Sequence, residues 1–475
     1  MSWLYEYREI PSEKNGLIKA RKLFGLWEVT VQGTGESSSY LTAMWTSAMK
    51  RVPIHAPIKR VLMLGLAIGS NLGPLHRRFP NCKVTVIEWD PAMIKLFHEI
   101  GESGLPAPEI IEGDATEMIR TLKEPYDLIM ADVFTGGDIG APMRRPDFYD
   151  QLARLLKPTG FLLINWYANP ELANLLAPHF VEPESWTWRL NNLSLTQPKL
   201  PENYVPYRSD PGFLRRESNT IGYRKVVESN GVFGITWGFG PLRFGRFEGD
   251  REPSLITTGP RRLIYWQRLT RRTAPPGWSR ALISMPTRLT GFVDLSQDPA
   301  EGNWTSHARR HLGRWRKQEA FVIKDVDVET FLKGYRRSDL RSSVKSTFGP
   351  MLRQKKIDHG ERLRFFGVVR VADGKLRGGF VSLDIPESSQ SVHIASFVSR
   401  DAERAAAGYG LVDRWFHHGR EKGLRFMDFD GFWAPGDPSG WKGFSKFKSQ
   451  FGVTFIRRAP LLSRSMGGSK KTSGV

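Results

Sequence analysis

The first half of the chain is patterned by short apolar runs that each end in a small residue or an acid. Residues 61–64 run into a glycine turn, residues 84–87 are followed by Glu88, and two further runs are followed by Asp114 and Asp132. Short continuous apolar runs are typical of parallel strands buried on both faces. The pattern predicts an α/β sheet with polar residues at the carboxyl ends of its strands, where open α/β sheets bind ligands.

The turn after the first run consists of small residues, which permit a sharp turn and a close approach of a ligand to the backbone. Glu88 lies 23 residues after Gly65, close to the spacing of roughly 20 residues at which an acid accepts hydrogen bonds from ribose hydroxyls. Asp114 is placed to accept from an adenine amino group. The candidate nucleoside-binding residues are Gly65, Ala67, Gly69, Glu88, Asp114 and Ala115. The alternative is a turn that only lets a helix pack on its strand.

The second half has a different order of strand-like and helix-like segments. An Asp-Gly turn at 373–374 between two strand-like runs predicts a β-hairpin. The predicted strands cover residues 320–324, 363–371, 376–384, 391–398 and 423–431, and the predicted helices cover 327–335 and 404–416. This order indicates a mixed α+β domain.

These elements divide the chain into segments. Three prolines in residues 196–206, without apolar periodicity, mark a linker that is predicted over residues 196–212. The other predicted segments are a β-rich segment at 1–55, a Rossmann-like domain at 56–195, a poorly defined lobe at 213–300, an α+β domain at 301–465 and a disordered tail at 466–475.

Positive charge is concentrated in the second half. Residues 1–200 hold 21 Lys and Arg against 22 Asp and Glu, whereas residues 201–475 hold 48 against 27. A basic half of this size is typical of proteins that contact phosphates, either in nucleic acid or on an anionic membrane surface. The alternative is ordinary solvated surface charge.

Cysteine content and hydropathy indicate the cellular compartment of the protein. The single Cys82 excludes an intramolecular disulfide and a multi-cysteine metal site, which suits a reducing cytoplasm. No apolar run approaches the roughly 20 residues needed to span a bilayer, and the first residues lack the apolar core of a secretory signal. We therefore expect a soluble, cytoplasmic protein.

The motifs of the first half together resemble the spermidine synthase branch of class I AdoMet-dependent transferases. The resemblance is carried by the glycine turn, residues 86–91, residues 113–115, Asp132 and residues 147–160. It implies a Rossmann-like fold, AdoMet or decarboxylated AdoMet as the cofactor, and a small amine as the substrate. It also implies that Asp132 positions and deprotonates the amine, with Tyr40 and Thr135 at the substrate.

Two positions depart from the aminopropyl-transferring members. Those members carry an acid within the glycine turn, where this chain has Ile68, and a second acid three residues after the position of Asp132, where this chain has Thr135. A polyamine is a string of ammonium groups that carboxylates hold. The resemblance therefore supports cofactor binding better than transfer to a polyamine, and methyl and aminopropyl transfer both stay open.

The second half resembles the GNAT superfamily, and its tail is similar to the closing motif of Fem-type peptidoglycan aminoacyltransferases. The tail motif is Phe-Asp-Gly at 429–431 followed by residues 441–452. In the GNAT fold, a glycine turn at a helix N-terminus binds the pyrophosphate of the donor. The resemblance implies this role for Gly408 and Gly410, with Arg404 nearby. The donor is then acyl-CoA, or aminoacyl-tRNA as in Fem-type members.

The sequence is thus interpreted as an α/β Rossmann-like AdoMet-transferase domain followed by a mixed α+β GNAT-like domain. The first alkylates an amine, and the second transfers an acyl or aminoacyl group. The alternative is a non-catalytic Rossmann scaffold joined to a basic half that binds tRNA or another nucleic acid. Ile68 and Thr135 favour the scaffold, whereas the acids at two strand tips, Glu88 and Asp114, oppose it.

Overall fold

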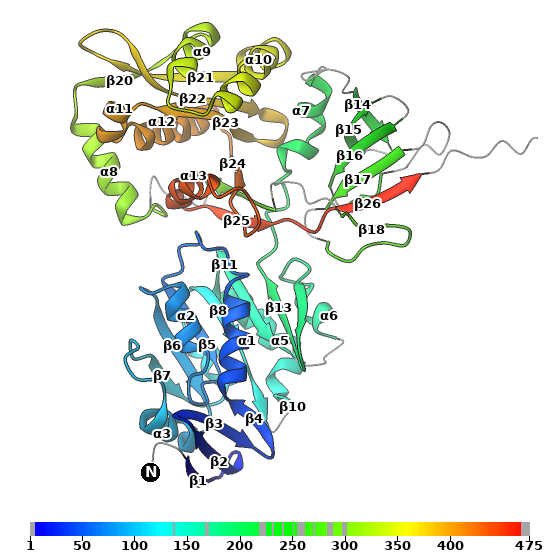
Figure 1. Cartoon of the computed structure of the whole chain (residues 1–475), viewed down its shortest axis with the longest axis vertical. Helices are drawn as coiled ribbons and strands as arrows, with labels where there is room; N and C mark the ends of the chain where they lie inside the picture. The colour runs from blue at the N-terminus through cyan, green and yellow to red at the C-terminus, as the bar shows by residue number, and fades with distance from the viewer. Residues whose placement is uncertain are drawn as a thin grey trace, which may run out of the picture. The chain divides into compact units, whose positions relative to one another are not determined.

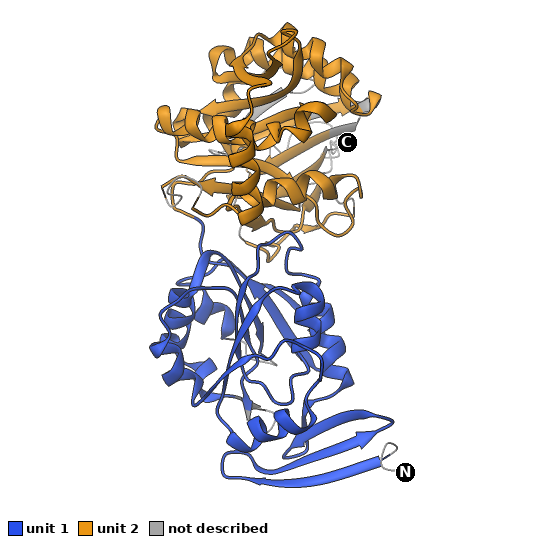
Figure 2. Cartoon of the chain, turned by 90° about the vertical axis from the view of Figure 1, so that its left-hand side faces the viewer, with its two compact units in different colours: residues 1–200 blue, residues 201–475 orange. Residues whose placement is uncertain are grey.

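The chain forms two compact units in a computed structural model, unit 1 over Met1–Leu200 and unit 2 over Pro201–Val475 (Figures 1 and 2). The structure describes residues 5–135, 138–166, 171–217, 225–229, 232–239, 242–249, 251–253, 262–268, 271–282, 288–296 and 302–466. Within these ranges, no helix combines the length and the apolar character needed to cross a membrane.

Unit 1 is built on a largely parallel sheet, whose described strands follow the order β12-β13-β11-β8-β5-β6-β7. In that order the strands are Glu184–Trp188, Asn191–Thr196, Leu156–Asn165, Tyr126–Ala131, Arg60–Leu64, Lys83–Glu88 and Glu109–Glu112. The strands from β11 to β7 are parallel, and β13 is antiparallel to β11. The chain order reverses between β5 and β8, which is where such sheets bind ligands.

Apolar strand residues bury this sheet against helices. Leu62 and Leu64 of β5 share a buried cluster with Phe148 and Leu152, and all six positions of β8 are buried, as its continuous apolar run predicts. The helices of unit 1 are α1 (Ser39–Met49), α2 (Leu72–Arg78), α3 (Pro91–Ile100), α4 (Ala115–Thr121), α5 (Pro146–Leu155) and α6 (Leu172–Leu176).

An antiparallel sheet in the order β1-β2-β3-β4 precedes the parallel one. Its strands are Tyr5–Ser12, Gly16–Leu23, Leu26–Val31 and Thr34–Ser37. Ile18 and Val31 of this sheet pack with Ile68 of the glycine turn and Met93 of α3 in one apolar cluster. The small sheet is therefore anchored directly on the predicted nucleoside site.

The main sheet of unit 2 has the order β20-β21-β22-β23-β24-β19-β25 in the described chain. These strands are Phe321–Asp325, Leu363–Arg370, Leu376–Ile385, Gln390–Val398, Phe426–Phe432, Leu289–Asp294 and Thr454–Arg457. The accompanying helices are α7 (Pro211–Arg216), α8 (Ser306–Lys317), α9 (Val328–Arg337), α10 (Ser342–His359), α11 (Arg400–Arg404), α12 (Ala407–Glu421) and α13 (Trp441–Lys448). The parallel strands β23 and β24 pair only over Gln390–Val392.

A second sheet of unit 2 combines strands from the predicted lobe at 213–300 with the last described strand of the chain. Its order is β14-β15-β16-β17-β26-β18, so β26 (red in Figure 1) lies between two strands of the predicted lobe. The strands are Lys225–Ser229, Val232–Phe239, Leu242–Glu248, Arg262–Gln267, Leu462–Met466 and Ser279–Arg280. β19, also predicted in the lobe, belongs to the main sheet, and residues 467–475 lie outside the described chain.

The predicted linker at 196–212 contains the boundary between the two units, which lies between Leu200 and Pro201. Thr196 ends β13, and the aromatic rings of Tyr204 and Tyr207 are buried in unit 2. The ring of Tyr204 stacks on Phe292 with 4.0 Å between centroids. The segment is proline-rich, but burial of the two tyrosine rings stabilises its packed conformation over an extended, solvated one.

Candidate functional site

The candidate site is a cavity of about 190 Å³ in unit 1. Stretches from distant parts of the sequence line it: β4 and α1, the turn after β5, the end of β6, the residues after β7 and the segment after β8. The last of these includes Phe134, the first residue of β9 (Phe134–Thr135), and Pro142, which follows the paired strand β10 (Asp138–Ile139). The cavity therefore lies at the carboxyl ends of β5 and β8, beside the reversal of strand order.

The glycine turn after β5 is a sharp turn, as predicted. Gly65, Ala67 and Gly69 all have positive φ, at 91°, 46° and 83°. A Cβ at residue 65 would overlap the carbonyl oxygen of Asp132. Glycine is therefore required here, because the ends of β5 and β8 approach too closely for any side chain.

Glu88 lines the cavity and also holds the glycine turn. One of its carboxylate oxygens accepts from the backbone N–H groups of Leu66 and Ala67 at 2.8 and 3.3 Å, and the other accepts from those of Trp89 and Asp90 at 2.9 and 3.1 Å. Burial raises the pKa of Glu88, and these four hydrogen bonds oppose the shift. The residue predicted to bind ribose thus also braces the turn.

Asp114 and Ala115 line the cavity at the start of α4. The Asp114 carboxylate accepts from the backbone N–H of Thr116 at 2.7 Å and from its hydroxyl, so it caps this helix. The contact of Asp114 with an adenine amino group stays a prediction. The capping bonds show that Asp114 also has a structural role.

Asp132 stands in the cavity wall immediately after β8. Its carboxylate accepts from the side-chain amide of Asn165 at 2.9 Å, and Trp45 hydrogen-bonds with it as well. Burial raises the pKa of Asp132 to about 6 against the effect of these bonds. A carboxylate with this pKa is ionised at neutral pH and is still basic enough to accept a proton.

Glu36 of β4 also lines the cavity, and the sequence analysis did not identify it. Its Oε1 atom is buried and has no hydrogen-bond partner in the described structure. Burial, followed by the charges of Asp132 and Glu88, raises the pKa of Glu36 to about 7. The only sequence feature that could have pointed to Glu36 is its position shortly before the predicted substrate contact Tyr40.

The cavity is acidic. Glu36, Glu88, Asp114 and Asp132 line it, and no lysine, arginine or histidine is found among the described lining residues. Carboxylates gathered without a cation raise one another's pKa and favour the binding of a positively charged ligand.

Two predicted substrate contacts have a different outcome. The hydroxyl of Tyr40 donates to the carbonyl of Trp188 at 3.1 Å and accepts from Asn191 at 2.9 Å, and Tyr40 is absent from the described cavity wall. The β12–β13 hairpin engages the phenol, and the role of Tyr40 as a substrate contact stays a prediction. The side chain of Thr135 lies outside the described residues.

In unit 2, the residues predicted to bind an acyl donor lie at the start of α12. Gly410 packs against the indole of Trp315 on α8, where a Cβ would overlap the ring. Gly408 is partly exposed, with Phe447 nearby, and Arg404 is exposed at the end of α11. At Gly410 the missing side chain therefore serves helix packing, and its role in binding a pyrophosphate stays a prediction.

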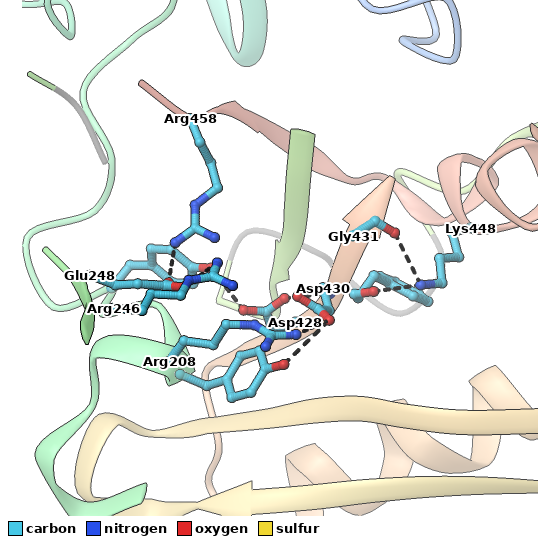
Figure 3. Close-up of polar contacts among 11 residues, drawn as sticks. Arg208, Arg246, Glu248, Asp428, Asp430, Gly431, Lys448 and Arg458 are labelled. Atoms are coloured by element: carbon cyan, nitrogen blue, oxygen red, sulfur yellow. Dashed lines mark hydrogen bonds and ion pairs between the residues drawn. The ribbon is translucent and has the colours of Figure 1, made fainter. Parts of the chain in front are cut away.

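A group of buried charged residues lies at the tail motif of unit 2 (Figure 3). Asp430, held at a positive φ of 56°, accepts from Arg208 at 2.9 Å. Asp428 accepts from the hydroxyl of Tyr204 at 2.9 Å. Burial, and then the charge of Asp430, raises the pKa of Asp428 to about 6. Two carboxylates are thus held on β24 with a single residue between them.

Basic residues surround these carboxylates. Lys448 donates to the backbone carbonyls of Phe429 and Gly431 at 2.6 and 3.3 Å, and burial lowers its pKa to about 8. Figure 3 shows Arg458 directed at Glu248, with which it forms a buried ion pair. The tail motif therefore supplies a polar core to unit 2, and its lysine, with a pKa of about 8, begins to lose its proton just above neutral pH.

Comparisons with known proteins concern mainly unit 1. Residues 61–160 match a family model described as a methyltransferase domain. The polyamine aminopropyltransferase of Chromobacterium violaceum is 26% identical over 113 residues, which are 23% of this chain and 43% of that protein. Polyamine aminopropyltransferase 1 of Streptomyces coelicolor is 28% identical over 121 residues, 23% of each chain. The chain thus spans less than half the length of these curated relatives.

Solved structures give weaker likenesses. FemX has a TM-score of 0.42 at 10% identity, covering 54% of this chain and 91% of that one. A probable spermidine synthase from Corynebacterium glutamicum has a TM-score of 0.34 at 16% identity, covering 43% and 84%. By sequence, residues 61–160 of unit 1 thus match a methyltransferase domain model, and part of the chain is similar to polyamine aminopropyltransferases.

Proposed function

We propose that unit 1 binds AdoMet or decarboxylated AdoMet and transfers an alkyl group, methyl or aminopropyl, to a small amine. The observation that carries this proposal is the charge of the cavity, where four carboxylates meet without a basic side chain among the described lining residues. A sulfonium cofactor and a protonated amine are both cations, so both gain from this field. The match to a methyltransferase family model supports the same cofactor.

The residues of the chain divide the work. The bound cofactor supplies a carbon activated by a sulfonium leaving group. The glycine turn lets a nucleoside approach the backbone, and Glu88 and Asp114 offer acceptors on the cavity wall. Asp132 orients the amine and takes one proton from it, which frees the nitrogen lone pair. The nitrogen–carbon bond then forms as the sulfur–carbon bond breaks and the neutral thioether leaves. Asn165 holds the carboxylate in one orientation.

The test is a calorimetric titration of the protein with AdoMet, decarboxylated AdoMet and methylthioadenosine, followed by product mass after incubation with amines. We expect binding of at least one cofactor, and the product mass identifies the transferred group. The Asp132→Asn variant should bind the cofactor within about threefold of wild type and lose roughly 100-fold or more in transfer rate. Failure of all three nucleosides to bind would contradict the proposal and favour the non-catalytic scaffold.

For unit 2 we propose a GNAT/Fem-like transfer of an acyl or aminoacyl group to an amine. The supporting observation is the buried group formed by Asp430 and Lys448 of the tail motif and the adjacent Asp428. Because Gly410 is covered by Trp315, we favour aminoacyl-tRNA over acyl-CoA as the donor.

Measurements of tRNA binding and of aminoacyl transfer distinguish the two proposed functions of unit 2. A steep fall in tRNA affinity with salt is expected if the basic surface contacts phosphates. Transfer of the aminoacyl group to an amine supports the enzyme, whereas binding without transfer supports the nucleic-acid-binding alternative.

A further inference from the structure

Glu36 reaches the cavity because of an irregularity in the antiparallel sheet. Val29 of β3 pairs with Ser37 of β4, and the next residue, Thr30, pairs with Gly35. Glu36 is therefore the extra residue of a β-bulge. Bulges re-aim side chains and are frequent beside active sites, and here the bulged residue lines the cavity.

Two acceptor atoms in the cavity wall are buried without a hydrogen-bond partner in the described structure: Oε1 of Glu36 and Oδ1 of Asn71. Asn71 is only 4% exposed, and its side chain does not cap α2. Because buried polar atoms in proteins are nearly always hydrogen-bonded, this pair of acceptors indicates a ligand that donates hydrogen bonds.

The two acceptors belong to segments that are tied together. The hydroxyls of Ser37 and Ser70 lie 2.6 Å apart, and the backbone N–H of Ser38 donates to the Ser70 hydroxyl at 3.2 Å. Glu36 precedes the first of these serines, and Asn71 follows Ser70. The hydrogen bonds therefore hold both acceptors at the junction of β4 and the glycine turn.

We propose that Glu36 and Asn71, together with Asp132, form a subsite for one alkylammonium group of the acceptor substrate. This inference rests on the proposed amine alkylation by unit 1. An ammonium group has three N–H donors and a single positive charge, and the subsite offers three acceptor side chains, two of them carboxylates. Glu36 thus takes over the part of the acids that are missing at Ile68 and Thr135.

The subsite recognises one charge only. Ile68 is 7% exposed and packs with Ile18 and Val31 in the apolar cluster under the antiparallel sheet. Of the other acids in the described wall, Glu88 and Asp114 are engaged by backbone N–H groups. A polyamine held along its length needs further free carboxylates, so the acceptor is a monoamine or an amine whose second charge contributes little.

Proton release gives a signature of Glu36. Glu88, Asp114 and Asp132 face it across the cavity, and burial with the charges of Asp132 and Glu88 raises its pKa to about 7. An ammonium ion binds the ionised carboxylate, so binding near pH 6.5 displaces a proton from Glu36. For the same reason, amine affinity rises as the pH increases through about 7.

The experiment uses the full chain saturated with methylthioadenosine and titrated calorimetrically with butylamine and with 1,4-diaminobutane. Two buffers of different ionisation enthalpy at about pH 6.5 report the proton released. We expect Glu36→Gln to weaken butylamine binding at least tenfold and to abolish most of the proton release. Asn71→Ala should weaken it several-fold and keep the proton release.

A matched control is Glu28→Gln, which removes an acid of the neighbouring strand β3 that pairs with Arg21 outside the cavity. It should leave amine affinity and proton release unchanged, and thermal midpoints verify that each variant folds. If the wild-type protein binds no nucleoside, the proposed function fails. If it binds nucleoside and amine while Glu36→Gln and Asn71→Ala match wild type, only the subsite is overturned. Diamine binding more than about tenfold tighter than monoamine binding would overturn its restriction to one charge.

Discussion

The buried carboxylates of unit 1 carry a cost in stability at the residue scale. Burial raises the pKa of Asp132 to about 6 and that of Glu36 to about 7. A group whose pKa is higher in the folded than in the unfolded protein stabilises the fold at low pH, and this contribution is lost as the pH rises through the folded pKa. The negative charge that attracts cations to the cavity therefore lowers the free energy of unfolding at neutral pH.

The variant Asp132→Asn should accordingly stabilise the protein, although it impairs transfer. The asparagine removes a buried charge, so we expect a gain of about 1–3 kcal/mol in the free energy of unfolding above pH 6, shrinking as the pH falls towards 4. Urea unfolding across this range measures it. Asp147→Asn is the control, because its pKa is lowered by Arg145 and Arg120 at the surface. An equal gain in both variants would contradict the role of burial.

The ion pair of Glu248 and Arg458 gives the opposite expectation in unit 2. Both side chains are nearly fully buried, and Arg246 also pairs with Glu248. Glu248→Gln leaves the arginines uncompensated and should reduce the free energy of unfolding by about 3–5 kcal/mol. Glu361→Gln breaks a pair with Lys356 in which the glutamate is 85% exposed, and we expect little change in its urea midpoint. Similar midpoints for the two variants would refute this expectation.

At the element scale, the close approach of β5 and β8 depends on one glycine. Gly65→Ala introduces a Cβ that overlaps the backbone of Asp132, so the turn must move and nucleoside binding should fall more than tenfold. Gly104→Ala is matched in backbone strain, since Gly104 has a φ of 84° and open space around it; it should lower stability by about 1 kcal/mol without affecting binding. Calorimetric titration and thermal unfolding measure both variants, and equal nucleoside affinity would argue against the turn as part of the site.

The contact of α8 with α12 depends on another glycine. Gly410→Ala introduces a methyl group that overlaps the Trp315 indole, and overpacking of this kind reduces stability by about 1–3 kcal/mol. Gly408→Ala on the same helix is the comparison, because a Cβ there would lie 3.2 Å from the Phe447 ring edge. We expect the larger drop in thermal midpoint for Gly410→Ala. The reverse order would show that packing against Trp315 does not require a glycine at this position.

At the scale of the whole molecule, unit 1 is almost neutral and unit 2 carries the excess of positive charge. Because each unit has its own buried clusters, we expect two transitions in scanning calorimetry. Methylthioadenosine at about 100 times its Kd should stabilise unit 1 by about 2.7 kcal/mol and leave the other transition in place. A single transition that shifts as a whole would show that the units unfold together.

Much of the fold follows from local pattern. The apolar runs of β5, β6 and β8, the glycine turn and the Asp-Gly hairpin between β21 and β22 lie where the sequence predicts them. Each depends on neighbouring residues alone, through burial on both faces of a strand or through a backbone conformation that glycine favours. Local pattern could not predict that Tyr204, in the predicted linker, buries its ring against Phe292, more than 80 positions away.

The sequence by itself therefore determined that acids stand at the carboxyl ends of parallel strands beside a small-residue turn. Tertiary structure decided which oxygens remain available: Glu88 is engaged by four backbone N–H groups, whereas Glu36 enters the same cavity unpartnered through a bulge in a separate sheet. It also turned Tyr40 towards another hairpin and Ile68 into an apolar cluster. The physical reason is that hydrogen-bond satisfaction and electrostatic fields arise between segments distant in the chain, and no local pattern records them.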